Sequence, residues 1–322
     1  MMRDRYLPLL ATIAVFAALY IAGGMFYPRI FSSLVFGHLL ADNAFIIIAA
    51  IGVTFVIISG GIDLSIGSMI GFVGVAMASL IQAGWDPVLV LVLVLVFGLL
   101  YGAFQGFIID FCDIQPFIAT LSGLFLLRGA CFMVNLNSTP IRSPFVSWFN
   151  NIYVDLPGGG FLTGGALVML FMLALAIVIA HYTRFGTNVY AMGGDRPSAI
   201  LMGMPMRRTT VMIYALAGFY SAVAGVIYAM NTSSGYPLAG NTLELSAIAA
   251  SVLGGTMLTG GVGLVVGALF GGMILALIST IIIFNGSLNG AWIMIATGFL
   301  LFAFIVIQRW IVSSFSSAAK AD

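Results

Sequence analysis

Long apolar runs separated by short polar breaks fill almost the whole chain. A helix needs about 20 apolar residues to cross a hydrocarbon core about 30 Å thick, so the sequence predicts about ten transmembrane helices. The predicted spans are 7–27, 43–59, 64–82, 88–110, 117–134, 162–180, 209–230, 244–258, 263–284 and 291–312. The runs 43–59 and 244–258 are short and abut glycine-rich breaks, so broken or re-entrant helices are alternatives there. The fold class is an all-α polytopic membrane protein with a single transmembrane domain over residues 1–322.

The longest polar interruption with a helix of its own is the loop 181–208. Asp195 can cap a short helix, Pro197 suits its first turn, and Gly203, expected at positive φ, ends it. A helix of about two turns is too short to be stable alone in water and needs a partner surface. The predicted coupling segment is Asp195, Arg196, Pro197, Ser198, Ala199, Ile200, Leu201, Met202 and Gly203. It is either a structured loop or a docking helix that transmits force from a soluble motor.

Basic residues predict the orientation, because cytoplasmic loops of membrane proteins carry an excess of Lys and Arg. If about ten spans cross the membrane in alternating directions, most of the basic residues fall on one side of the membrane: Arg3, Arg5, Arg184, Arg196, Arg207, Arg208, Arg309 and Lys320. Only Arg29 and Arg142 fall in loops on the other face. Both termini and the loop 181–208 are therefore predicted to be cytoplasmic. The outer-face loop 135–161 is either a lid or a landing surface for an extracytoplasmic partner.

One short pattern occurs twice. Residues 60–67 and 254–261 both read G-G-x-x-L-[ST]-x-G, and each copy separates two apolar segments. Glycines permit unusual backbone angles and let helices approach closely. The repeat is either a coincidence between glycine-rich turns or a pair of matching helix breaks, which transporters place close to the substrate path.

Ionisable groups within spans are costly and mark functional candidates. Asp63 can cap the following helix or face a polar path, and Glu244 suits the start of its short span. Arg128 can extend outward or pair with a carboxylate such as Glu244. The candidate path or signature residues are Asn43, Gly60, Gly61, Asp63, Ser65, Thr120, Arg128 and Glu244. Because the spans hold no fixed array of charges, we expect a neutral polar solute rather than an ion.

Composition agrees with a polytopic membrane protein. Only 7% of residues are charged and 62% are hydrophobic, with a mean hydropathy of +1.18, whereas soluble domains hold about 25% charged residues. The sequence has no basic patch interleaved with aromatic residues, so it gives no indication of nucleic-acid binding. The sequence lacks a P-loop, H-E-x-x-H and G-x-S-x-G, so we expect no catalytic residue, metal site or cofactor in this chain. A stand-alone secondary transporter, with Asp63 or Glu244 as proton site, is the alternative to a permease driven by a separate motor.

Three stretches carry a family likeness. SGGIDLSIGSMIGFVG at 59–74, TRFGTNVYAMGGDRPSAILMG at 183–203 and ELSAIAASVLGGTMLTGGVGLVVGALFG at 244–271 resemble the ribose-type sugar permeases of bacterial ATP-binding cassette (ABC) importers. The stretches DNAF at 42–45, PFIATLSGLFLLRG at 116–129 and PGGG at 157–160 look closest to a permease subunit of galactofuranose importers. Against that pattern, Asp195 replaces the usual Asn, and the outer loop also differs in composition. The resemblance therefore indicates the fold more firmly than it indicates the sugar.

The resemblance implies a type-II importer architecture in the bacterial inner membrane, surrounded by lipid. Two permease subunits, identical or related, would enclose one path for a galactofuranose- or ribose-like monosaccharide. Two ATPase subunits would bind ATP and Mg²⁺ below them, and a periplasmic sugar-binding protein would deliver the sugar from above. Residues 193–203 would be the coupling helix against the ATPase. Arg142 would meet carboxylates of the docked binding protein.

Overall fold

The computed structural model describes residues 2–287 and 290–318, and side chains from 7 to 287 and from 290 to 306. The side chains of Arg3, Arg5, Arg309 and Lys320, on which the predicted orientation partly rests, lie outside this part. The described chain is mostly helical. A helix forms at each of the ten predicted apolar segments: α1 (Met2–Phe26), α3 (Ala44–Ile58), α4 (Ile66–Gln82), α5 (Pro87–Phe111), α6 (Pro116–Val134), α8 (Gly164–Tyr182), α11 (Met206–Thr232), α12 (Leu243–Leu253), α13 (Val265–Asn285) and α14 (Ala291–Ala318).

Fewer of these helices have the length of a full span. In the described part, α1, α5, α6, α8, α11 and α13 are long and apolar enough to cross a membrane, and α2 with α3 makes a seventh if that bent pair is one span. The helices α4 and α12 and the described apolar part of α14 are shorter. The protein is thus a polytopic membrane protein with six or seven candidate spans, and a count of about ten stays a prediction.

Several elements form where no regular structure was predicted. They are the 3-10 helix η1 (Pro28–Phe31), α2 (Ser33–Ala41), α7 (Pro144–Asn150), α9 (Arg184–Gly194), and the strands β1 (Thr139–Pro140), β2 (Tyr153–Leu156), β3 (Gly160–Thr163) and β4 (Ser234–Gly235). The strands make two short antiparallel pairs, β1 with β4 and β2 with β3. Helices α2 and α3 meet at an angle of 52°. The loop 135–161 is therefore a folded layer, and the all-α expectation omitted its strands.

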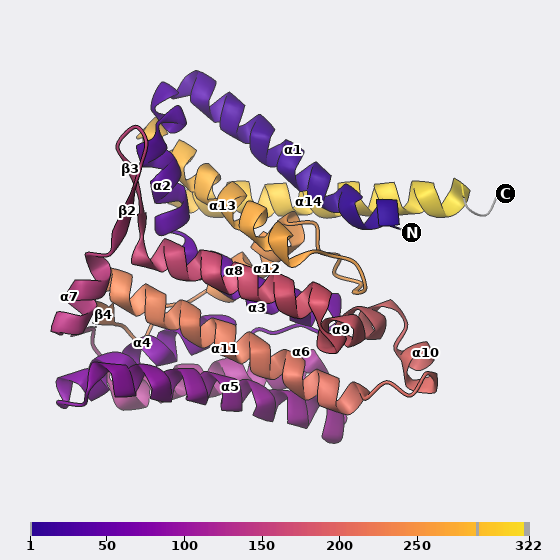
Figure 1. Ribbon diagram of the computed structural model, residues 1–322, viewed down its shortest axis with the longest axis horizontal. Coiled ribbons are helices and arrows are strands. Elements are labelled where there is room, and N and C mark those ends of the chain that lie inside the picture. Colours follow the sequence, from indigo (N-terminus) through magenta and orange to yellow (C-terminus); the bar gives the residue numbers. More distant parts are fainter. Residues whose placement is uncertain (1, 288–289, 319–322) are drawn as a thin grey trace.

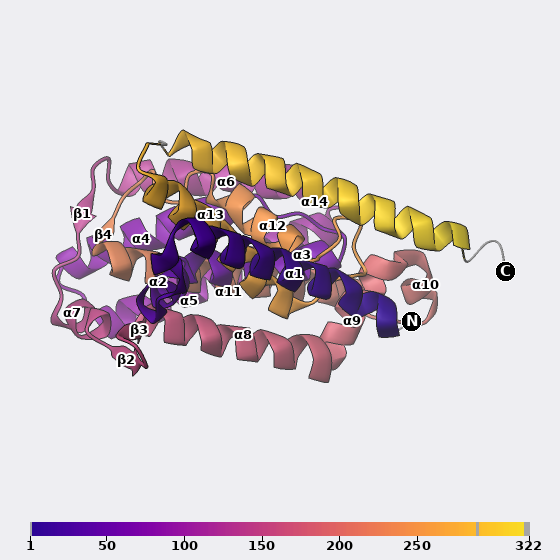
Figure 2. The same ribbon diagram turned by 90° about the horizontal axis from the view of Figure 1, so that it is seen from above.

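Helix α11 lies in the middle of the bundle, with α8 on one side and α5 on the other (Figure 1). In the perpendicular view, α14 and α8 run along opposite edges (Figure 2). Helices α5 and α11 approach backbone to backbone, because a Cβ added at Gly102 would lie 2.1 Å from the Tyr214 carbonyl oxygen. A Cβ at Gly218 would lie 2.3 Å from the Gly98 carbonyl oxygen. Small residues at such spacing let membrane helices pack closely, so α5 and α11 form a tight pair.

The molecule has two distinct ends (Figure 1). The hairpin β2–β3 lies at one end with α2 and α7, where Gly160 and Gly37 let the hairpin contact the backbone of α2. At the opposite end lie α9, the helix α10 (Arg196–Leu201), the start of α1 and the end of α14. The loop 181–208 therefore shares an end of the bundle with the start of α1 and the end of α14.

Candidate functional site

The loop 181–208 folds into two capped helices. The Thr183 hydroxyl accepts the amide of Gly186 at 3.2 Å and begins α9. Asp195 caps α10 as predicted, because its carboxylate accepts the Ser198 amide at 3.3 Å and the Ser198 hydroxyl as well. These hydrogen bonds, the hydroxyl first, lower the pKa of Asp195 below its usual range. Gly203 adopts φ +76° and ends the helix, which confirms the prediction of a left-handed residue there.

Helix α10 has one fixed face and one free face. Ala199 is fully buried, whereas Ile200 and Leu201 are 54% and 89% exposed. Met204, just beyond the helix, packs on the core. Ile200 and Leu201 thus present exposed apolar surface on α10.

An ion pair anchors α10 to the tight pair of helices. The Arg196 guanidinium donates to the carboxylate of Asp110 at the end of α5, which is only 3% exposed. The Thr210 hydroxyl on α11 donates to the same Asp110 oxygen at 3.3 Å. Beside it, the Arg207 guanidinium lies 5.4 Å from the centre of the Phe111 ring. Helix α10 is therefore linked to α5 and α11 through a nearly buried carboxylate.

The preceding helix α9 contacts the second copy of the repeated glycine pattern and the end of α3, just before the first copy. The Gly261 amide donates to the Ile58 carbonyl oxygen at 2.8 Å. A Cβ at Gly193, near the end of α9, would lie 1.7 Å from that carbonyl oxygen. A Cβ at Gly260 would lie 3.0 Å from the Gly60 Cα atom. The two breaks thus meet each other and the end of α9, which explains glycine at these positions and argues against a coincidental repeat.

A buried polar group lies in the first break. Asp63 is 2% exposed, and its Oδ1 atom accepts the Ser65 amide at 2.8 Å and contacts the Ser65 hydroxyl at 2.7 Å. That hydroxyl also lies 3.1 Å from Gln105 Oε1 on α5. Among the described residues, Gln105 Nε2 is buried without a hydrogen-bond partner. Asp63 does not cap α4, because that helix begins at Ile66 and Ser65 occupies the cap position; the Asp63 carboxylate accepts from Ser65 instead.

The second candidate pair, Arg128 and Glu244, flanks an irregular segment between α11 and α12. Arg128 Nη1 on α6 donates to the carbonyl oxygens of Pro237 and Ala239 at 2.6 and 2.7 Å. Glu244 lies in the first turn of α12 as predicted. In the described part of the chain, Arg128 and Glu244 form no salt bridge within 4.0 Å, although Arg128 acts on the Glu244 carboxylate electrostatically, so a direct ion pair stays a prediction. Arg128 instead supplies donors to carbonyl groups that irregular backbone leaves unpaired.

Glycines on α4 leave room for the same irregular segment. A Cβ at Gly71 would lie 2.6 Å from the Ala239 carbonyl oxygen, and one at Gly67 would lie 2.0 Å from Glu244 Oε2. Among the described residues, Glu244 Oε2 is buried without a hydrogen-bond partner. The α4 face beside the first break therefore meets the segment that leads into the second, and Asp63 and Glu244 lie near the same helix.

The remaining candidates are scattered. Thr120 donates to the Pro116 carbonyl oxygen of its own helix at 2.8 Å. Asn43 lies at the junction of α2 and α3 and donates to the Leu39 carbonyl oxygen at 3.2 Å. Arg142 is exposed in the loop 135–161, beyond β1. These three do not join the groups around Asp63 and Glu244.

The sequence analysis missed two residues that the structure shows to matter, one beside Asp63 and one at the base of α10. Gln105 is a lone amide in an apolar run of α5, and Asp110 is a lone carboxylate near that helix's end. A polar side chain isolated in a predicted span is itself a signal, because it must find a partner inside the bundle. Its partner could not be read from the sequence, since Gln105 meets Ser65 across 40 residues and Asp110 meets Arg196 across 86.

Comparison with known proteins assigns the chain to a family. The family described as branched-chain amino acid transport system / permease component matches residues 34–305. The inner membrane ABC transporter permease protein YjfF of Escherichia coli K12 is 47% identical over 309 residues, covering 96% of this chain and 93% of that protein. The fructose import permease protein FruG of Bifidobacterium longum is 32% identical, covering 95% and 92%. The ribose import permease protein RbsC of Bacillus subtilis is 37% identical, covering 74% and 73%. No solved structure matches the chain.

Proposed function

The chain belongs to the ribose-type sugar permeases of ABC importers, within the family of permease components described above, and from this premise we propose its role in transport. It is a multi-pass inner-membrane protein. We propose that it is the permease subunit that carries a monosaccharide, galactofuranose- or ribose-like, through the bacterial inner membrane. The relatives named for fructose and ribose import support a sugar.

One observation carries this proposal. A short helix, capped at Asp195 and ended at Gly203, presents Leu201 at 89% exposure while an ion pair from Arg196 fixes its base. Such a helix suits a coupling element, because a lever must be rigid where it joins the bundle and apolar where it meets its partner. The residues 195–203 would then dock on an ATPase subunit that binds ATP and Mg²⁺, outside this chain.

The proposed orientation follows from the shared end of the bundle. With α9 and α10 towards the cytoplasm, both termini would be cytoplasmic, and the loop 135–161 with Arg142 would face a sugar-binding protein in the periplasm. The chain would form one transmembrane domain of about ten spans, and a second permease subunit, identical or related, would complete the path. Gly60, Gly61, Asp63, Ser65, Arg128 and Glu244 would belong to the moving breaks beside that path, and Asn43 and Thr120 would flank it.

The test is sugar uptake by the reconstituted complex. The chain is placed in liposomes with its ATPase subunits, its partner permease and the binding protein, and labelled D-ribose, D-fructose and D-galactose are offered. We expect uptake of one sugar only with internal ATP and independent of a proton gradient. Uptake by this chain alone, driven by a proton gradient, would show instead that it is a secondary transporter with Asp63 or Glu244 as proton site.

A further inference from the structure

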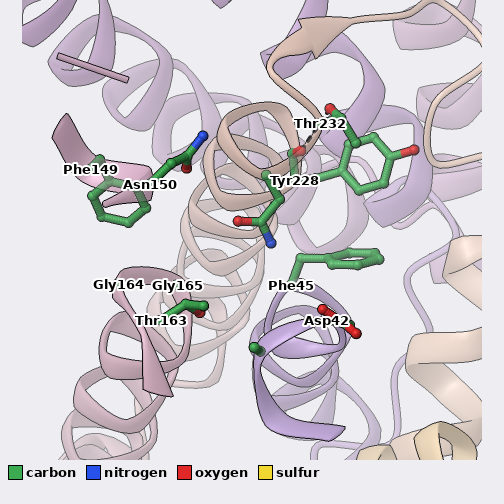
Figure 3. Close-up of a pocket in the computed structure, with 11 residues that line it drawn as sticks. Asp42, Phe45, Phe149, Asn150, Thr163, Gly164, Gly165, Tyr228 and Thr232 are labelled. Carbon is green, nitrogen blue, oxygen red and sulfur yellow. Dashed lines mark hydrogen bonds between the residues drawn. The ribbon is translucent and has the colours of Figure 1, made fainter. Parts of the chain in front are cut away.

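A pocket opens at the end of the bundle opposite α10. It has a volume of about 400 Å³, within the range of about 300–1,000 Å³ that small-molecule sites occupy. Four separate parts of the chain line it: the α2–α3 junction, the end of α7, the start of α8 and the end of α11. Figure 3 shows Phe149, Asn150 and Thr163 on one side of the pocket and Asp42, Phe45 and Tyr228 on the other.

The sequence keeps this space open. Two consecutive glycines, Gly164 and Gly165, begin α8 at the wall of the pocket. A Cβ added at Gly165 would lie 3.1 Å from Ile227 Cγ2 and 3.7 Å from Asn231 Oδ1. A side chain there would press on α11 and narrow the pocket.

The aromatic walls of the pocket are held in place. The rings of Phe45 and Tyr228 meet edge to face, with centroids 5.0 Å apart and an interplanar angle of 73°. This geometry is favourable between aromatic side chains and fixes both rings. A fixed ring can pack against the C–H face of a sugar, whose hydroxyl groups then point towards the polar side chains around it.

Several polar groups in the pocket have capacity to spare. Among the described residues, the Asn231 amide and the Tyr228 hydroxyl make no hydrogen bond. The Asn150 amide nitrogen donates to the Met230 carbonyl oxygen at 2.8 Å, which fixes the side chain and leaves its oxygen as an acceptor. Asp42 Oδ2 lies 3.3 Å from His38 Nδ1, so the second carboxylate oxygen remains as an acceptor for a solute.

This mixture selects one class of solute. The lining holds one carboxylate and neither Lys nor Arg, so an anionic sugar or metabolite would meet repulsion without a compensating cation. An apolar solute would leave the amides and hydroxyls of the wall without partners, which is unfavourable. A cation would meet a single carboxylate that His38 already contacts. A neutral polyhydroxylated ring matches both the aromatic faces and the unpaired donors and acceptors.

We propose that this outer pocket, with Asp42, Phe45, Asn150, Thr163, Tyr228 and Asn231 in its wall, is a receiving site for a neutral monosaccharide. The choice of a monosaccharide rests on the proposed function, while the pocket and its residues come from the structure alone. The site takes sugar at the mouth of the permease, before the glycine breaks near the opposite end move. Asn231 supplies an amide to a hydroxyl of the sugar, and Asp42 accepts from another.

The direct test is protection of an introduced cysteine. Asn231→Cys is made in a Cys112→Ser background, which removes the exposed natural thiol and leaves the buried Cys131. Labelling by a small thiosulfonate reagent is timed in nanodiscs with D-ribose, D-fructose or D-galactose at high millimolar concentration. We expect at least one of these sugars to slow labelling severalfold, and gluconate to have no effect. The control is Asn151→Cys, directly after the last residue of α7, because Asn151 is exposed and does not line the pocket.

Transport provides the second measurement. Losing one hydrogen bond to the sugar weakens binding up to about tenfold. Asn231→Ala and Asp42→Asn should therefore raise the sugar concentration that gives half-maximal uptake by about that factor. Asn151→Ala should transport like the wild type, and no variant should change retention of the ATPase subunits. Failure of all three sugars to protect Asn231→Cys, or normal uptake by both pocket variants, overturns the proposal.

The outcomes separate the pocket from the proposed function. Protection by sugar without ATP-driven uptake keeps the pocket and refutes the importer. ATP-driven uptake without protection keeps the importer and refutes the pocket. Protection of Asn231→Cys by sugar-free binding protein, with no protection by sugar, would show a docking surface in place of a sugar site and would also overturn the proposal.

Discussion

The substitution Leu201→Asp tests whether residues 195–203 are a coupling helix or an ordinary loop. Leu201 is 89% exposed at the tip of α10, so the permease gains almost nothing from its side chain when it stands alone. Exposed substitutions away from special features change stability by about 0.5 kcal/mol or less. We therefore expect Leu201→Asp to insert, fold and melt like the wild type.

A substitution at Leu201 should change the affinity for an ATPase subunit far more than it changes the stability of the permease. Burying a Leu side chain contributes about 1.5–3 kcal/mol, and every 1.4 kcal/mol changes affinity about tenfold. Leu201→Ala should therefore weaken the ATPase complex by roughly ten- to a hundredfold. Leu201→Asp should weaken it further, because it also buries a carboxylate without a partner.

The assay is co-purification of the ATPase with each permease variant, followed by ATP turnover in nanodiscs. Leu136→Asp is the matched control, because Leu136 is also strongly exposed, at 71%, but lies in the loop 135–161. We expect the control to retain the ATPase and its stimulation by loaded binding protein. A Leu201→Asp complex that stays intact and responds to that protein would refute the coupling role of residues 195–203.

Three further predictions concern other parts of the chain. Gly193→Ala should abolish folded protein, because its Cβ would lie 1.7 Å from a carbonyl oxygen of α3. The control Gly194→Ala has open space around its Cβ and should fold normally. The yield of each variant in size-exclusion chromatography is the measurement. Arg142→Glu should weaken docking of the binding protein at low salt and less so at high salt, since exposed charges are screened within about 8 Å at physiological ionic strength; equal affinity at low salt would contradict this. Hydrogen bonds from Ser198 lower the pKa of Asp195. The stability that this cap contributes should therefore be fully present above the pKa of an unfolded Asp, and it should be lost as pH falls through the lowered pKa. Ser198→Ala should raise the pKa of Asp195, which NMR titration measures.

Helix placement was largely determined by local sequence. Apolar runs can satisfy their backbone groups in a membrane only as helices or closed barrels, so each of the ten runs gave a helix. The cap of α10 was also readable, because Asp195, Pro197 and Gly203 act within one short segment. Helix α2 and the hairpin β2–β3 were missed, since they contact each other at Gly37 and Gly160 and show no periodic pattern.

Partnership between distant residues was decided only by the tertiary structure. The sequence indicated that Asp63, Arg128 and Glu244 must find partners inside the bundle, because isolated polar groups there are costly. It could not indicate that Asp63 would reach Gln105 through Ser65, or that Arg128 would bind carbonyl groups instead of Glu244. Hydrogen bonds act over about 3 Å, whereas these partners are separated by 40 residues or more along the chain. The packing of α4, α5, α6 and α11 brings these partners within hydrogen-bond distance. Because that packing depends on residues far apart along the chain, the local pattern of apolar and polar residues could not predict it.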